Sequence, residues 1–99
     1  MPWEPPDGCK VTYIYPSPCK GPCATIAYQM RGPGRVRIRV WNSAGQWAAE
    51  IAERKSVGPQ TSRLTVRDYA SGVYLYRVMF DYDSGVFERL SPVRFVVSH

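Results

Sequence analysis

Three cysteines in the first quarter of the chain are the residues whose spacing first suggests chemistry. Three residues separate Cys19 from Cys23, one more than in thioredoxin-type redox pairs, and the pattern does not fit haem attachment. A tetrahedral zinc site would need a further ligand, and the only histidine is His99. The cysteines therefore predict no metal site and no cofactor.

A disulfide is the chemistry that these cysteines suit best. Lys20-Gly21-Pro22 is turn-like, so we expect Cys19 and Cys23 to pair in an oxidising compartment. If residues 10–16 and 24–29 are neighbouring antiparallel strands, Cys9 lies roughly 20 Å from Cys23, beyond the ~7 Å that a disulfide spans. Cys9 is then free or bonded to another part of a larger protein. The alternative is three reduced, half-buried thiols.

A second group that could do chemistry is a row of arginines. The chain carries a formal charge of +5, and Arg35, Arg37 and Arg39 alternate with apolar residues. On a β-strand, alternate side chains share one face at ~6.6 Å intervals, so three guanidiniums there suit successive phosphates, sulfates or uronates. The row predicts an anion-binding face for acidic polysaccharide or, less favoured, nucleic acid.

Other residues decide how far that face extends. It would widen if the strands carrying Arg63, Arg67 and Arg77 adjoin it, and Trp41 or Trp47 would add stacking. The alternative is a solvated sheet face in which the arginines form cross-strand pairs with glutamates, for which three are available: Glu50, Glu53 and Glu88.

The elements that must position these side chains are strands, because apolar residues alternate with period two and the helical period is weak. Residues 46–53 contain Ala and Glu, but Trp47, Ala49 and Ile51 alternate, which favours a strand. Residues 55–60 contain Gly58-Pro59 and are expected to form a loop. The expected strands are 10–16, 24–30, 35–41, 46–53, 62–66, 73–80 and 86–97.

About seven short strands with turns every ~8–12 residues predict an all-β fold, an immunoglobulin-like (fibronectin III-like) antiparallel β-sandwich. The domain would span residues 10–99, with the proline-rich residues 1–9 as the remnant of a linker. A tyrosine near the start of the sixth strand of such a sandwich can hydrogen-bond upstream backbone as a tyrosine corner. Tyr74 fits this place, with Asp68 as a turn acceptor and Gly72 allowing a sharp entry into the strand.

These pieces resemble a known family. Tyr15-Pro16-Ser17-Pro18 followed by Ala24-Thr25-Ile26-Ala27-Tyr28 resembles the "YPNP … TIxY" opening of FlgD-type immunoglobulin-like domains and of the C-terminal sorting domains of type IX secretion cargo. The segments 34–45, 68–78 and 93–97 resemble the "G-x-V-x-I-x-V-Y-D-x-x-G", "D-x-x-x-G-V-Y-x-Y-R-L" and "x-K-F-V-V" strands of the same domains. Ser17 and Cys19 depart from the family's usual asparagine and aromatic residue.

The resemblance implies an immunoglobulin-like domain near the C-terminus of a large exported bacterial protein, extracellular, on the cell surface or in the periplasm. Its expected role is anchoring, export targeting or extracellular assembly, without catalysis. One terminal histidine offers no Ser-His-Asp or Cys-His arrangement, and no apolar run approaches the ~20 residues of a membrane span. The expected partners are the rest of the parent protein or cell-envelope components, with contact through Cys9 or an edge strand.

Overall fold

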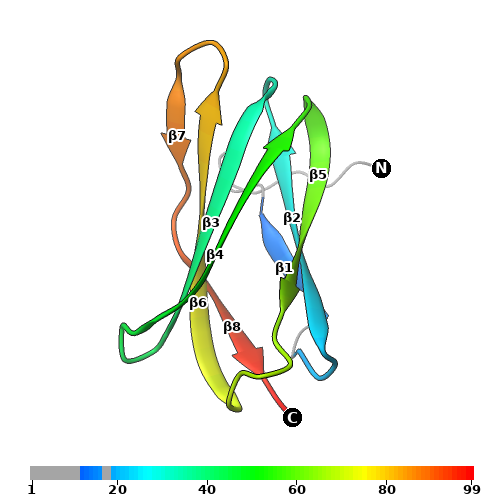
Figure 1. Ribbon diagram of the computed structural model, residues 1–99, viewed down its shortest axis with the longest axis vertical. Coiled ribbons are helices and arrows are strands. Elements are labelled where there is room, and N and C mark those ends of the chain that lie inside the picture. Colours follow the sequence, from blue (N-terminus) through cyan, green and yellow to red (C-terminus); the bar gives the residue numbers. More distant parts are fainter. Residues whose placement is uncertain (1–11, 17–18) are drawn as a thin grey trace.

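The computed structural model describes residues 12–16 and 19–99, and the predicted linker 1–9 and Cys9 lie outside this range. The described residues form strands and turns without a helix, and two antiparallel sheets face each other as a β-sandwich (Figure 1). The strands are β1 (Tyr13–Tyr15), β2 (Cys23–Met30), β3 (Gly34–Asn42), β4 (Trp47–Lys55), β5 (Gly58–Thr65), β6 (Gly72–Tyr82), β7 (Phe87–Arg89) and β8 (Val93–Val97).

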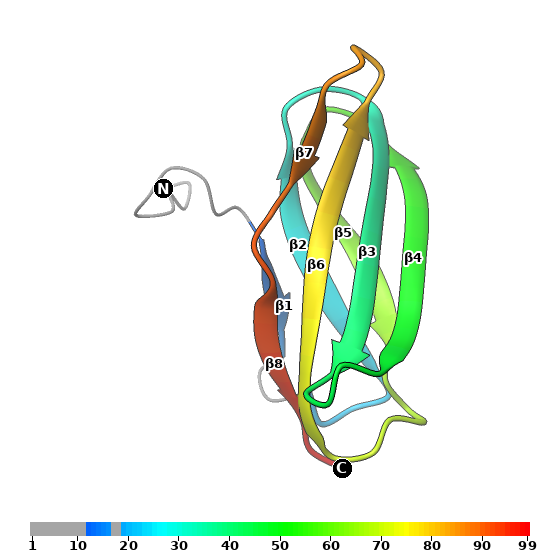
Figure 2. The ribbon, with the colours of Figure 1, turned by 90° about the vertical axis from the view of Figure 1, so that its left-hand side faces the viewer.

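The strands divide unequally between the two sheets. One sheet has the order β1-β2-β5, and the other has the order β4-β3-β6-β7 with β8 also paired to β6 (Figure 2). The long β6 pairs with β7 near its C-terminal end and with β8 near its N-terminal end. The single last strand predicted over 86–97 is therefore two strands, and Pro92, which lacks a backbone donor, lies between them.

The core lies between the sheets and comes from alternate residues of each strand. Val36, Ile38 and Val40 of β3 are fully buried, as are Tyr76 and Phe80 of β6. Burying a side chain of this kind contributes about 1.5–3 kcal/mol. The predicted all-β sandwich, and the predicted inward face of β3, are confirmed.

The ambiguous segment is a strand, β4, as the alternation predicted, but one of its side chains faces the other way. The register pairs Val40 with Ala49 and then Trp41 with Trp47, so a β-bulge leaves Ala48 as the extra residue. A one-residue shift moves a side chain to the opposite face of the sheet. Trp47 is consequently 68% exposed, whereas Ala49 and Ile51 pack against the core.

The loop predicted over 55–60 is wrong. Only Ser56 and Val57 separate β4 from β5, and Gly58, at φ 111°, already pairs with Met30 of β2. A positive φ of this size is readily adopted by glycine, which lets the chain turn tightly from one sheet to the other.

Candidate functional site

The three predicted arginines line the outer surface of the five-stranded sheet. Arg35, Arg37 and Arg39 are exposed and alternate with the buried valines and isoleucine of β3. Residues paired directly across two antiparallel strands share a face. The register places Arg54 of β4 opposite Arg35, and Arg77 of β6 opposite Arg39.

Two further arginines join this surface from the other side of β6. Arg89 of β7 pairs with Met79, which itself pairs with Arg37, and Arg94 of β8 pairs with Leu75. We call this surface the arginine face, with Arg35, Arg37, Arg39, Arg54, Arg77, Arg89 and Arg94 as its basic residues. Among the described strand residues, the register places two acidic side chains on this face, Glu50 opposite Arg39 and Asp81 opposite Arg35.

The other arginines expected to widen the face lie elsewhere. Arg63 belongs to β5, in the three-stranded sheet, and Arg67 follows that strand. Sequence reasoning missed Arg89 and Arg94, although Arg94 alternates with apolar neighbours. Their place on the face depends on the pairing of β7 and β8 with opposite ends of β6.

Ion pairs neutralise part of the arginine face. The Glu50 carboxylate lies 3.5 Å from Arg37 Nε and 3.7 Å from Arg39 Nε, and Asp83 accepts two hydrogen bonds from Arg54, one of them at 3.1 Å. Within the residues that the structure describes, the remaining four arginines of the face form no ion pair: Arg35, Arg77, Arg89 and Arg94. Arg77 Nε is buried and has no hydrogen-bond partner there.

The other two glutamates expected to pair with this row are engaged elsewhere. Glu53 accepts a hydrogen bond from Ser62, and Glu88 accepts one from Tyr82 and lies 3.6 Å from Arg31. The expected cross-strand pairing is therefore met by Glu50 alone.

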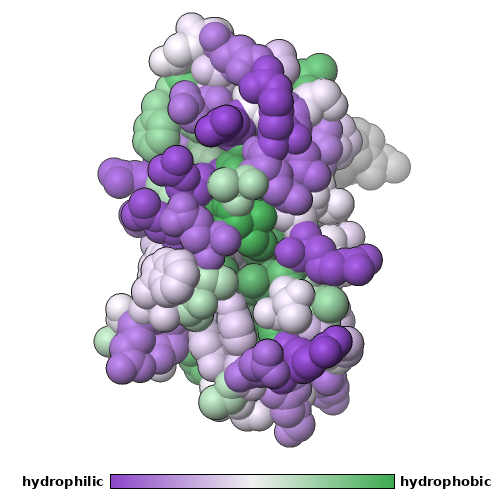
Figure 3. Space-filling model, in the orientation of Figure 1, coloured by the Kyte–Doolittle hydropathy of each residue, from purple (hydrophilic) through white to green (hydrophobic). Residues whose placement is uncertain are grey.

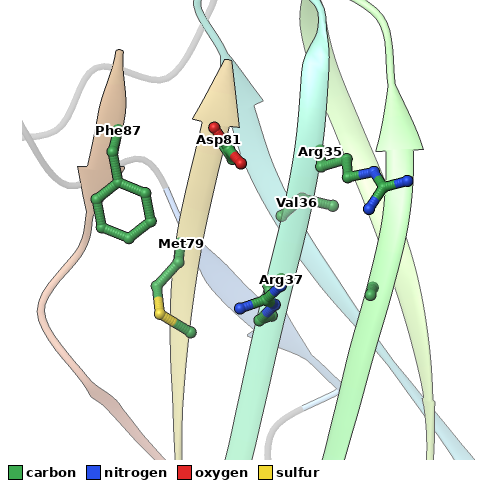
Figure 4. Close-up of a pocket in the computed structure, with 7 residues that line it drawn as sticks. Arg35, Val36, Arg37, Met79, Asp81 and Phe87 are labelled. Atoms are coloured by element: carbon green, nitrogen blue, oxygen red, sulfur yellow. The ribbon is translucent and has the colours of Figure 1, made fainter. Parts of the chain in front are cut away.

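Apolar side chains lie between the guanidiniums on the same face. Figure 4 shows Phe87, Met79 and Arg37 side by side on β7, β6 and β3, with the Arg35 side chain extending toward β4. With Asp81, Val36 and Ala52 they line a shallow hollow of about 80 Å³. Phe87 is 61% exposed, so the face offers an aromatic surface beside unpaired positive charge.

The two predicted disulfide partners are free thiols in this structure. Cys19 is fully buried in the core, its Sγ lies 3.3 Å from Pro16 O, and burial raises the pKa of its thiol. Cys23 alternates with buried Ala24 and Ile26, so its side chain is on the outer side of the three-stranded sheet. The predicted Cys19–Cys23 bond is not formed because the side chains lie on opposite sides of that sheet.

Cys19 has a backbone role instead. Its N–H donates to Val96 O at 2.8 Å, and its carbonyl accepts from Ser98 N–H at 2.9 Å, in a parallel bridge to Val97. These two bonds join the segment before β2 to the last strand.

The Tyr74 hydroxyl donates a hydrogen bond to Ala70 O at 2.8 Å, which is the geometry of a tyrosine corner. Tyr74 itself is buried and packs against Tyr69 and Phe95. Asp68 is exposed in the turn ahead of β6, and Gly72 begins the strand. These residues position the chain and present no side chain to the arginine face.

A hydrogen-bonded chain that the sequence did not reveal links the two sheets at their β4 and β5 edges. Ser62 Oγ donates to Glu53 Oε1 at 2.5 Å, and Tyr28 Oη lies 2.7 Å from Ser62 Oγ. Because the single Ser62 hydrogen goes to Glu53, Tyr28 must donate to Ser62. Burial raises the pKa of Tyr28, and the nearby Glu53 charge raises it further. Figure 3 shows this side of the molecule, where hydrophobic side chains are visible between the polar ones of the two edges.

The described residues contain no group of three or more His, Cys, Asp or Glu side chains that could hold a metal ion. Among the same residues, no helix is long and apolar enough to cross a membrane. The chemistry that this arrangement supports is recognition by a surface.

The two-sheet architecture defines the class of protein as an immunoglobulin-like β-sandwich. The chain is similar in fold to CopC from Methylosinus trichosporium OB3b, with a TM-score of 0.57 and 15% identity over 88% of this chain and 93% of that one. No curated protein matches the chain.

The family is given by the match of residues 13–88 to the secretion system C-terminal sorting domain. The chain belongs to this family, as its strand motifs predicted, and is therefore part of an exported protein.

Proposed function

We propose that this domain is a non-catalytic export signal, which directs a larger parent protein through a bacterial secretion system to the cell surface. The observation that carries the proposal is the family match over residues 13–88, which covers β1 to β6 and reaches into β7. Residues 10–99 would form the domain, and residues 1–9 would end the linker from the parent protein.

The sandwich itself supports a role in recognition by contact. Its edge strands leave backbone donors and acceptors that another chain can pair with, so contact with the secretion machinery or envelope components through an edge is part of the proposal. Cys9, outside the described residues, would add a covalent contact. The only histidine, His99, has its ring Nε2 2.9 Å from Val66 O and is not paired with a nucleophile from the part of the chain that the structure describes.

The test is to fuse the 99 residues behind a periplasmic reporter enzyme in a bacterium that has the secretion system. We expect reporter activity outside the outer membrane, and none there in a strain without the secretion pore or with the reporter alone. Reporter on the cells indicates anchoring as well, whereas reporter in the medium indicates sorting only. A fusion that stays in the periplasm despite a folded domain contradicts the proposal.

A matched pair of variants tests whether export requires the folded domain. Gly34→Val is expected to unfold the domain, because a Cβ at Gly34 would lie 2.5 Å from Asp81 O and 2.7 Å from Tyr82 Cα. Gly45→Ala lies in an open turn where no atom is within 4 Å of the added Cβ, although its φ of 85° makes it mildly strained. Export should be lost with the first substitution and kept with the second.

A further inference from the structure

We propose that the arginine face binds an acidic polysaccharide, a polymer of sugars that carry carboxylate, phosphate or sulfate groups. The observation behind this is the juxtaposition, on one sheet surface, of four arginines that form no ion pair with any described residue and of exposed apolar side chains. The inference depends on the proposed function only for its location, because export brings the face to envelope and matrix polysaccharides.

The excess positive charge of the arginine face favours binding of an anion. The face holds seven arginines against Glu50 and Asp81 and against Asp83, which pairs with Arg54, and the register sets Arg39 directly opposite Arg77. Like charges directly opposite across a sheet destabilise it. Glu50 offsets Arg39, but nothing in the described part of the chain offsets Arg77, whose Nε is also without a hydrogen-bond partner. An anion bound on this face beside Arg77 would supply the negative charge that offsets it.

The register also shows how positive and apolar groups are arranged. One cross-strand row holds Phe87, Asp81, Arg35 and Arg54, and the next holds Arg89, Met79, Arg37 and Ala52. Neighbouring strands are ~4.8 Å apart and alternate residues along a strand ~6.6 Å apart. Apolar side chains therefore lie close to arginines on this face, as Met79 does between Arg37 and Arg89.

This mixture of arginines and apolar side chains suits a sugar better than a nucleic acid duplex. A sugar ring has an apolar C–H face that can pack on exposed Phe87 and half-buried Met79 in the hollow of Figure 4, while its acid group reaches Arg35 or Arg37. In a duplex the bases are stacked inside, so Phe87 would gain no apolar partner. The apolar side chains of the face are thus what favours a polysaccharide.

The experiment measures binding of the 99-residue chain to immobilised polygalacturonate, dextran sulfate, uncharged dextran and duplex DNA over a range of NaCl concentrations. We expect salt-sensitive binding to at least one acidic polysaccharide, weaker binding to DNA and none to dextran. Binding to polygalacturonate alone assigns carboxylates, and binding to dextran sulfate alone assigns sulfates. DNA binding as tight as polysaccharide binding, or no acidic polysaccharide bound at low salt, overturns the proposal.

Two matched double substitutions locate the site. Arg35→Gln with Arg94→Gln removes two exposed, unpaired charges from the arginine face, and Arg63→Gln with Arg67→Gln removes two from elsewhere on the surface. The first pair should weaken polysaccharide binding about tenfold, and the second about twofold or less. Equal losses would show that net charge alone binds the polymer, and would overturn the site.

A third variant tests the apolar contribution. Phe87→Ser, at an exposed edge position, should weaken polysaccharide binding and leave any residual DNA binding unchanged. An unchanged polysaccharide affinity would contradict the sugar-packing argument. A chain that exports the reporter but binds no polymer refutes this inference and leaves the proposed function standing.

Discussion

The Tyr28–Ser62–Glu53 chain allows a sharp test of how the two sheets are held together. Tyr28 and Ser62 are each only 3% exposed, so water cannot readily replace a lost partner. Ser62→Ala removes the bond to Glu53 and leaves the buried Tyr28 hydroxyl without an acceptor. A lost hydrogen bond costs about 1 kcal/mol and an orphaned buried group about 1–3 kcal/mol, so we expect a loss of about 3 kcal/mol in the free energy of unfolding.

The companion substitution has a smaller expected cost. Tyr28→Phe removes the buried hydroxyl together with its bond, while Ser62 keeps Glu53, so the expected loss is about 1 kcal/mol. In the double variant no Tyr28 hydroxyl is left unpaired, and the expected loss is about 2 kcal/mol, less than the two single losses together. Thr61→Ala, an exposed neighbour on the same strand, serves as the control and should change stability by less than about 0.5 kcal/mol.

Urea unfolding followed by tryptophan fluorescence measures all four variants. In a domain of this size each kcal/mol also moves the melting temperature by about 4–8 °C, which gives an independent reading. Additive single losses, or a Ser62→Ala cost no larger than that of Tyr28→Phe, would refute the reasoning, because the extra cost of Ser62→Ala comes from the orphaned Tyr28 hydroxyl.

Three further predictions concern other buried groups. Tyr74→Phe should lower the free energy of unfolding by about 1 kcal/mol, since it removes only the 2.8 Å bond to Ala70 O; an unchanged urea midpoint would contradict this. Burial raises the pKa of Tyr76 from 10.0 to about 12, so its neutral form stabilises the fold fully below pH 10, and that stability is lost as the pH rises toward 12, by about 3 kcal/mol. Unfolding curves between pH 9 and 12 should show this loss, and Tyr76→Phe should reduce the slope. In native protein, alkylation should label Cys23 before buried Cys19, and non-reducing mass spectrometry should find both as thiols; a Cys19–Cys23 peptide lighter by two hydrogens would contradict the structure.

How far the sequence predicts the structure is clearest at β3 and β4. In β3 the alternation of arginine with valine and isoleucine continues without interruption, so both its strand character and its buried face follow from the sequence. In β4 the same reasoning found the strand but placed Trp47 with Ala49 and Ile51, because a bulge leaves no clear mark in the pattern of side chains. The loop predicted at Gly58-Pro59 failed for a related reason, since these residues begin an edge strand, where a missing backbone donor is tolerated.

The arginine face shows which features follow from the local sequence and which depend on the tertiary structure. The sequence by itself determined the fold class, the family and the outward row Arg35, Arg37 and Arg39, because period-two alternation and short motifs are local properties of a strand. Only the tertiary structure decided which distant residues join that row. Pairing of β7 and β8 with opposite ends of β6 brings Arg89 and Arg94 to the face, whereas β5 crosses to the other sheet and takes Arg63 with it. Strand register and sheet membership depend on long-range packing, and no short stretch of sequence contains them.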